Sequence, residues 1–161
     1  MKIGFIGLGK MGFNMVHRLL EHQHEVVVWD RSEETIQKIE ALGAIGATSL
    51  EDLVSKLPAR KVVWLMVPAG KPVDENLEAL LSLLSKNDLV IDGGNSFWQD
   101  DVRRGQALRA MGLHYLDVGT SGGVWGLERG YCMMIGGDKV VVDRLDPIFA
   151  ALAPGIGDIP R

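Results

Sequence analysis

The segment at residues 7–12, Gly-Leu-Gly-Lys-Met-Gly, has the residue types and spacing that could bind a dinucleotide. In such sites the first glycine allows a tight turn, the second lets the main chain approach the diphosphate, and the third lets a helix pack closely on a strand. Free N–H groups at the helix N-terminus would then hold the diphosphate, because the helix dipole favours an anion there. The alternative is a turn that only joins a strand to a helix. The predicted cofactor contacts in this segment are Gly7, Leu8, Gly9, Lys10, Met11 and Gly12.

The residues on either side of this glycine turn favour the dinucleotide interpretation. An apolar run at residues 2–6 precedes the turn, a helical pattern follows it, and a second apolar run then ends on Asp30. A carboxylate there can accept hydrogen bonds from both hydroxyls of the adenosine ribose, whereas it would repel a 2′-phosphate. NAD is therefore the predicted cofactor. Arg31 could pair with a 2′-phosphate, which keeps NADP open as the less favoured cofactor.

Three further loops follow predicted strands, at the edge of the sheet where this architecture places ligands. They are residues 66–70, 92–96 and 119–123. Asn95 can donate and accept hydrogen bonds at once, which suits a ribose or substrate hydroxyl, although asparagine is also a common turn former. The segment Ser121-Gly122-Gly123 offers a hydroxyl and consecutive N–H groups that suit a carboxylate, or it forms a flexible turn.

A sheet must position these loops, and the hydropathy pattern predicts one. Apolar runs alternate with helical patterns, and several runs are apolar at successive positions, as in strands whose two faces are both covered by helices. The predicted fold is a doubly wound α/β domain, with a mostly parallel sheet and helices on both faces. The predicted strands are residues 2–6, 26–30, 61–67, 89–92, 114–118 and 131–135, with a possible short strand around 44–47. The predicted helices are residues 11–22, 33–42, 50–56, 73–85, 98–111 and 139–150.

Local signals mark several ends of these helices. Ser32 precedes two glutamates and can cap the helix they begin. Ser49 and Asp52 have the spacing of a capping box with a shorter acid. Gly43 and Gly112 stand where C-terminal stops belong.

The composition is that of one globular domain. The chain has 161 residues, of which 47% are hydrophobic and 24% charged, and its net charge of −4 gives no reason to expect nucleic acid as a partner. The longest apolar run, residues 62–70, is too short for a membrane span, and the N-terminus does not resemble a secretion signal. A cytoplasmic location is therefore expected. Cys132 has no cysteine partner for an intrachain disulfide and is predicted to be a small core residue.

At its loops the chain resembles the 6-phosphogluconate dehydrogenase family, within the β-hydroxyacid dehydrogenase superfamily. The resemblance rests on residues 7–12, 65–67, 91–96 and 121–123, in this order and spacing. It covers essentially the whole chain, but only the family's N-terminal cofactor-binding domain, which is a Rossmann-type fold. Asp-Gly-Gly-Asn-Ser is the most specific element, whereas Ser-Gly-Gly is shared with relatives such as 3-hydroxyisobutyrate dehydrogenase.

The resemblance implies a ligand for each loop. Asn95 would lie near both the nicotinamide ribose and the substrate, and Ser121, Gly122 and Gly123 would hold the sugar acid. The family's reaction is hydride transfer from the C3 carbinol to the nicotinamide, followed by loss of CO2 from the β-keto acid to give ribulose 5-phosphate. The predicted cofactor contacts beyond the glycine turn are Asp30, Arg31, Ser32, Met66, Val67, Pro68, Ala69 and Asn95.

The chain departs from the family pattern at several positions. Asp30-Arg31-Ser32 stands where NADP-using members commonly have Asn-Arg-Thr, which supports NAD. Pro68 replaces a lysine common in the longer enzymes, and Val124 and Trp125 occupy positions that are often acidic. These differences resemble the shorter, NAD-linked type of the enzyme. They leave another β-hydroxyacid dehydrogenase, of the 3-hydroxyisobutyrate or tartronate semialdehyde type, as the alternative.

The family's general base has no counterpart in this chain. That base is a lysine in a Gly-x-x-x-Lys-x-x-x-Asn pattern on a helix just beyond the cofactor domain, and no lysine here has that context. We therefore expect residues 1–161 to bind cofactor but to be inactive alone, with a helical catalytic and dimerisation domain beyond Arg161. The full-length protein is expected to form a homo-oligomer and to act on a small sugar acid. The alternative from a different class is a complete NAD-sensing module without turnover.

Overall fold

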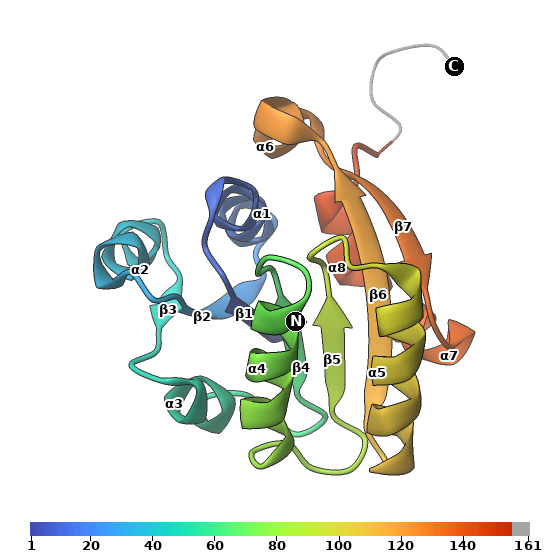
Figure 1. Ribbon diagram of the computed structural model, residues 1–161. Coiled ribbons are helices and arrows are strands. Elements are labelled where there is room, and N and C mark those ends of the chain that lie inside the picture. The colour runs from blue at the N-terminus through green and yellow to red at the C-terminus, as the bar shows by residue number, and fades with distance from the viewer. Residues whose placement is uncertain (156–161) are drawn as a thin grey trace.

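A seven-stranded sheet forms the centre of the structure, a computed structural model that describes residues 1–155 (Figure 1). The strands are β1 Lys2–Ile6, β2 Glu25–Trp29, β3 Ile45–Gly46, β4 Val62–Leu65, β5 Leu89–Asp92, β6 His114–Ser121 and β7 Cys132–Gly136. Their order is β3-β2-β1-β4-β5-β6-β7, in which only β6 and β7 pair in antiparallel fashion. The order reverses between β1 and β4, which is the switch point where doubly wound folds bind ligands. The predicted fold class is confirmed.

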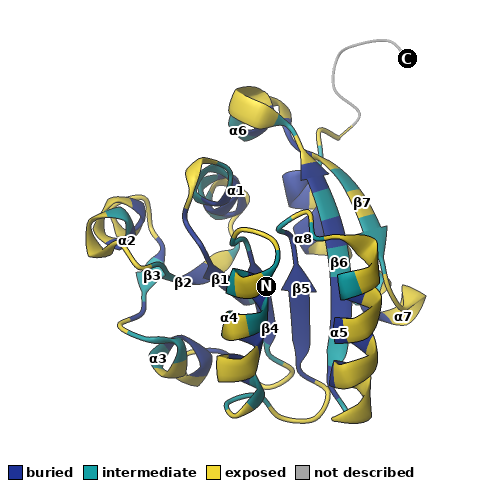
Figure 2. Ribbon diagram, viewed as in Figure 1, coloured by how far each residue is buried: buried dark blue, intermediate teal, exposed yellow. Residues whose placement is uncertain are grey.

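Helices cover both faces of the sheet. They are α1 Lys10–Glu21, α2 Glu33–Glu40, α3 Leu50–Ser55, α4 Lys71–Leu81, α5 Trp98–Ala110, α6 Gly126–Arg129, α7 Lys139–Arg144 and α8 Asp146–Leu152, with a 3-10 turn η1 at Gly123–Trp125. Buried side chains of α1, α2 and α8 form one core, and those of α3, α4 and α5 form the other. Along β4, Trp64 belongs to the first core and its neighbours Val63 and Leu65 to the second, which is why the strands are apolar at successive positions. Figure 2 shows the buried strands between helices whose outer faces are exposed. Within residues 1–155, no helix combines the length and hydropathy needed to cross a bilayer.

The ends of the helices follow the local signals in the sequence. Ser32 and Ser49 each accept a hydrogen bond from the main-chain N–H three residues later, at 3.3 and 3.0 Å. Gly43 and Gly112 have φ angles of +110° and +79°, in the left-handed region that favours glycine at a helix stop. The two serine caps and the two glycine stops are confirmed, whereas the Asp52 carboxylate accepts from the Thr48 N–H at 2.9 Å and so does not complete the predicted capping box.

The last third of the chain differs from the prediction in three ways. The predicted helix at 139–150 is two helices, because Pro147 at the start of α8 has no N–H with which to continue α7. The predicted loop at 119–123 is shorter, since β6 pairs with β7 as far as Ser121 and the helical turns η1 and α6 follow. Cys132 is exposed rather than a core residue, because β7 is the edge strand and Cys132 and Met134 face solvent on it.

Arg18 joins the beginning of the fold to its end. This arginine of α1 is buried, and its guanidinium donates hydrogen bonds to the carbonyl oxygens of Ala151 at 2.7 Å, Ala153 at 2.9 Å and Leu127 at 3.0 Å. These carbonyls lie in or next to the last turns of α6 and α8, where a cation is favoured by the helix dipole. Arg18 therefore holds α6, and η1 before it, beside α1.

Candidate cofactor-binding site

The glycine turn between β1 and α1 has the geometry that the sequence predicted. Gly7 has a φ of +100°, and an added Cβ would lie 2.2 Å from the Met66 carbonyl oxygen. A Cβ on Gly12 would lie 2.3 Å from the Gly7 carbonyl oxygen. At Gly9 a Cβ would meet no atom of residues 1–155 within 4 Å, and its φ of −62° suits any residue. The fold itself therefore requires Gly7 and Gly12, whereas the space beside Gly9 is open.

The N-terminus of α1 has no side-chain cap, and no acidic residue lies in its first turn. Gly9 is the N-cap residue. The first N–H groups of a helix lack intrahelical partners, and together with the dipole they attract an anion. Lys10 adds a positive charge at the same end. This end of α1 can therefore hold a diphosphate.

Asp30 is fixed against the glycine turn by two main-chain hydrogen bonds. Its Oδ2 accepts from the Leu8 N–H and its Oδ1 accepts from the Ser32 N–H, both at 2.8 Å. An ionised carboxylate offers about four acceptor positions, so each oxygen retains a lone pair for a further donor. The half-buried carboxylate thus has a set orientation at the rim of the site, with capacity for ribose hydroxyls. Arg31 and Ser32 beside it are exposed.

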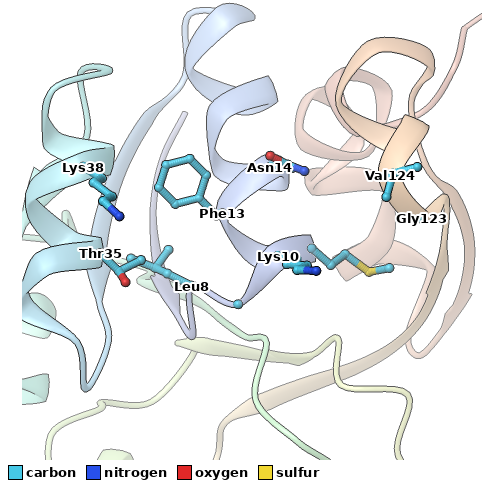
Figure 3. A pocket seen from close by; sticks show the side chains of 10 residues that line it. Leu8, Lys10, Phe13, Asn14, Thr35, Lys38, Gly123 and Val124 are labelled. Atoms are coloured by element: carbon cyan, nitrogen blue, oxygen red, sulfur yellow. The ribbon is translucent and has the colours of Figure 1, made fainter.

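Two cavities meet at Gly9, and together they contain most of the predicted cofactor contacts. The smaller, of about 320 Å³, lies at the ends of β1, β2 and β4, and its lining includes Asp30, Val67 and Pro68. The larger, of about 520 Å³, lies beside the N-terminus of α1 between α2 and η1 (Figure 3). Its lining includes Lys10 and Gly123, which are far apart in the sequence. Both volumes are in the range of small-molecule sites.

The loop after β4 and the loop after β5 are in main-chain contact. A Cβ on Gly94 would lie 2.4 Å from the Val67 carbonyl oxygen, so only glycine allows this approach. Met66 is held to β1 through its N–H, which donates to the Ile6 carbonyl oxygen at 2.7 Å. Ala69 is exposed in the same loop. The parallel pairing of β4 with β5 therefore brings the predicted contacts after β4 next to the loop that carries Asn95.

Asn95 links the loop after β5 to the end of β6. Its Oδ1 accepts from the Thr120 N–H at 2.9 Å and its Nδ2 donates to the Thr120 carbonyl oxygen at 3.3 Å, while its own φ is +54°. This pairing places Asn95 close to Ser121, as the proposed shared role in substrate binding requires. Ser121 is exposed, Gly122 packs against the Tyr131 ring, and Gly123 begins η1 with a φ of +53°.

A buried polar network supports these loops, and the sequence analysis did not predict it. Asp92 accepts hydrogen bonds from the Gly94 N–H at 2.9 Å and from the Ser96 hydroxyl. The Tyr115 hydroxyl donates to Asp101 at 2.6 Å and lies 3.3 Å from Asp92. Burial raises the pKa of Asp101 to about 6 and also raises the pKa of Tyr115. Desolvation likewise raises the pKa of Asp117, which lies on β6 two residues after Tyr115.

One signal in the sequence could have revealed this network. Asp101 and Arg104 lie on the same face of α5 as Leu108, at a spacing of three and then four residues, and all three are buried. Charged residues at core positions of a helix are expected to pair with one another or with a buried partner. Within residues 1–155, no group of His, Cys, Asp and Glu side chains is arranged to hold a metal ion.

The fold and the glycine turn together define a dinucleotide-binding domain of the Rossmann class. Residues 2–157 match the family model described as the NAD binding domain of 6-phosphogluconate dehydrogenase. The chain belongs to this family.

Individual relatives agree with this assignment. The NAD(+)-dependent, decarboxylating 6-phosphogluconate dehydrogenase of Haloferax volcanii is 46% identical over 155 residues, which cover 96% of this chain and 51% of the relative. The 6-phosphogluconate dehydrogenase of Plasmodium falciparum has a TM-score of 0.89 at 31% identity, over 99% of this chain and 36% of that one. The 3-hydroxyisobutyrate dehydrogenase of Mycobacterium tuberculosis has a TM-score of 0.87 at 28% identity, over 95% and 52%. The chain thus spans about half the length of these relatives or less.

Proposed function

We propose that this chain is the cofactor-binding domain of an NAD-dependent 6-phosphogluconate dehydrogenase, which oxidises and decarboxylates 6-phosphogluconate to ribulose 5-phosphate. The observation that carries the proposal is Gly9. Neither its backbone angles nor its protein neighbours require a glycine, yet it lies where the two cavities meet at the open end of α1. A diphosphate bound there would need that space.

The decisive experiment is calorimetric titration of residues 1–161 and of the Gly9→Ala variant with NAD. We expect the variant to keep its free energy of unfolding within about 1 kcal/mol, since a Cβ has no neighbour within 4 Å in the described part of the chain. We also expect it to lose measurable NAD binding, because the methyl group fills the space for the diphosphate. NAD binding by Gly9→Ala with unchanged affinity would contradict the proposed site, as would no binding by the unsubstituted chain.

In this proposal each element has a separate role. The N–H groups at the start of α1 hold the diphosphate, Asp30 accepts from the adenosine ribose, and the loop at 66–70 together with Asn95 lies along the nicotinamide ribose. Ser121-Gly122-Gly123 binds the sugar acid. The bound cofactor supplies the hydride acceptor, and the protein's part is to orient the two reactants. The Asn95–Thr120 hydrogen bonds support this arrangement, since they keep the cofactor loop beside the substrate loop.

The preference for NAD over NADP depends on Asp30 in this proposal. Its carboxylate is held at the rim of the smaller cavity, where a 2′-phosphate would meet a negative charge. We expect tighter binding of NAD than of NADP, and Asp30→Asn should weaken NAD binding about tenfold through the lost charge-assisted hydrogen bonds. Equal or tighter binding of NADP by the unsubstituted chain would contradict this part of the proposal.

We further propose that turnover requires a helical domain beyond Arg161 that carries the general-base lysine and forms the dimer contacts. Two facts support this: the chain covers 51% of the Haloferax relative, and residues 1–161 contain no lysine in the family's pattern. Oxidation of 6-phosphogluconate by residues 1–161 alone would contradict it. The full-length protein is proposed to be a cytoplasmic homo-oligomer, which its sedimentation and cell fractionation would test.

The second candidate function is another β-hydroxyacid dehydrogenase that acts on a smaller, unphosphorylated acid. The likeness to the Mycobacterium tuberculosis 3-hydroxyisobutyrate dehydrogenase favours it, with a TM-score of 0.87. Activity of the full-length protein on a panel of hydroxy acids separates the two. Preference for 6-phosphogluconate supports the main proposal, and preference for 3-hydroxyisobutyrate supports the alternative.

A further inference from the structure

A single buried side chain, Arg104 of α5, contacts both the loop after β4 and Asp92, the last residue of β5, where the next loop begins. Its Nη2 donates to the Gly70 carbonyl oxygen at 3.3 Å, and its Nε donates to Asp74 Oδ1 at 3.0 Å. Its Nη1 lies 3.5 Å from Asp92 Oδ2. The Arg104 side chain is 2% exposed and that of Asp92 is 1% exposed, so this contact is shielded from solvent.

On one side, Arg104 reaches the end of the loop after β4. Gly70 is the N-cap residue of α4 and has a φ of +90°, so its carbonyl direction depends on an unusual backbone conformation. Asp74 lies in the first turn of the same helix, and its hydrogen bond with Arg104 lowers the pKa of its carboxyl group. Arg104 therefore fixes the point at which the loop carrying Val67, Pro68 and Ala69 turns into α4.

On the other side, Arg104 reaches the loop after β5 through Asp92. The Asp92 carboxylate binds the Gly94 N–H and the Ser96 hydroxyl, and so it closes the turn around Asn95. Asn95 has a φ of +54°, in the left-handed region that asparagine adopts more readily than other non-glycine residues. The turn around Asn95 is thus closed by Asp92, whose carboxylate forms an ion pair with the buried Arg104.

The guanidinium group suits this double task. Burial of a charge costs several kcal/mol unless its partners offset it. Here Nε and Nη2 donate hydrogen bonds to Asp74 and Gly70, and Nη1 lies 3.5 Å from Asp92 in an ion pair, without a hydrogen-bond partner among residues 1–155. A lysine ammonium is a point charge and could not reach Gly70, Asp74 and Asp92 from one position. The geometry of these three contacts, and not only their charge balance, therefore favours arginine over lysine at position 104.

We propose that Arg104 is a positioning residue that sets the spacing between the loop after β4 and the loop after β5, and so pre-organises the nicotinamide half of the cofactor site. The inference rests on the proposed function, because it assumes that these loops bind NAD. Arg104 touches neither the glycine turn nor Asp30, so the adenosine half should be independent of it.

The test compares two ligands on residues 1–161. ADP contains the adenosine and diphosphate groups, whereas NAD adds the nicotinamide ribose. For Arg104→Gln and Arg104→Lys we expect the Kd for NAD to rise about tenfold and the Kd for ADP to change less than about twofold. The matched control is Arg103→Gln, since Arg103 is on the same helix and also contacts Asp74, at 3.3 Å, but its side chain is 60% exposed. Arg103→Gln should leave the ratio of the two Kd values unchanged.

The experiment distinguishes failure of this inference from failure of the proposed function. Equal weakening of NAD and ADP by the Arg104 variants would overturn the inference, as would unchanged affinity for both. If Arg104→Gln does not fold, Arg104→Lys carries the test, and failure of both to fold would overturn the inference by showing a purely structural role. Binding of neither ligand by the unsubstituted chain would overturn the proposed function and this inference with it.

Discussion

Replacing Asp101 by asparagine should stabilise the domain at neutral and alkaline pH. Asp101 is 90% buried on α5, and it accepts a hydrogen bond from the Tyr115 hydroxyl at 2.6 Å. It faces Asp92 from β5, Asp117 from β6 and, at 3.9 Å, the Arg104 guanidinium from its own helix. Burial and the two neighbouring carboxyl groups raise its pKa to about 6, so the ionised form is disfavoured in the folded state.

The direction of the pH dependence follows from this shift. Because the pKa of Asp101 rises from 3.8 when unfolded to about 6 when folded, the folded state binds the proton more tightly. The stability that this proton provides is complete below pH 3.8 and is lost as the pH rises through about 6. At about 1.4 kcal/mol per pKa unit, the loss is on the order of 2 to 3 kcal/mol. Asparagine has the shape of the protonated acid, can still accept from Tyr115, and does not ionise.

Urea denaturation at pH 4 and pH 8 measures the effect. We expect the Asp101→Asn variant and the unsubstituted chain to unfold with similar free energies at pH 4, and the variant to be more stable by about 2 kcal/mol at pH 8. The control is Asp100→Asn, on the same helix, where the side chain is 41% exposed and forms an ion pair with the exposed Arg103. A lower stability of Asp101→Asn at pH 8 would refute the reasoning, because the attraction to Arg104 would then outweigh desolvation.

Three further predictions follow from the packing. Gly12→Ala should lower the free energy of unfolding by about 2 kcal/mol, since its Cβ would lie 2.3 Å from the Gly7 carbonyl oxygen, and thermal denaturation at an unchanged temperature would contradict this. Arg18→Gln should cost about 2 to 3 kcal/mol and speed amide exchange in α6 and α8, whose carbonyl groups would lose their donor; uniform exchange rates would argue against this role. Cys132 should react with Ellman's reagent in the native protein at a rate close to that of the urea-unfolded chain, whereas protection would show that the thiol is covered.

The first half of the fold was predictable because its signals are local. A glycine turn, a capping serine and a glycine stop each act within a few residues, and Gly7, Ser32 and Gly43 all adopt the expected conformations. The position of Asp30 beside the turn follows from the parallel pairing of β1 and β2, which the two apolar runs predicted. Sequence spacing therefore predicted both the fold class and the approach of Asp30 to the glycine turn.

The features that the sequence did not predict depend on contacts between residues that are far apart in the sequence. The exposure of Cys132 follows from β7 being at the edge of the sheet, and the apolar run alone does not show which strand is last. Helix α6 is held by Arg18, more than 100 residues earlier in the chain, so no local pattern predicts it. The buried contact of Arg104 with Asp92 likewise joins α5 to β5 through tertiary packing.

Several of the residues expected to contact the cofactor are held in place by hydrogen bonds within the protein. Asp30 is tied to the glycine turn, Asp92 closes the loop after β5, and Asn95 is paired with Thr120, each through hydrogen bonds within the protein. A pre-organised site loses little conformational entropy on binding, so more of the contact energy contributes to affinity. This is why residues 1–161 are expected to bind NAD without the rest of the protein. Ser121, by contrast, is exposed at the end of β6, so a sugar acid bound as proposed would need further contacts, which the proposed helical domain would supply.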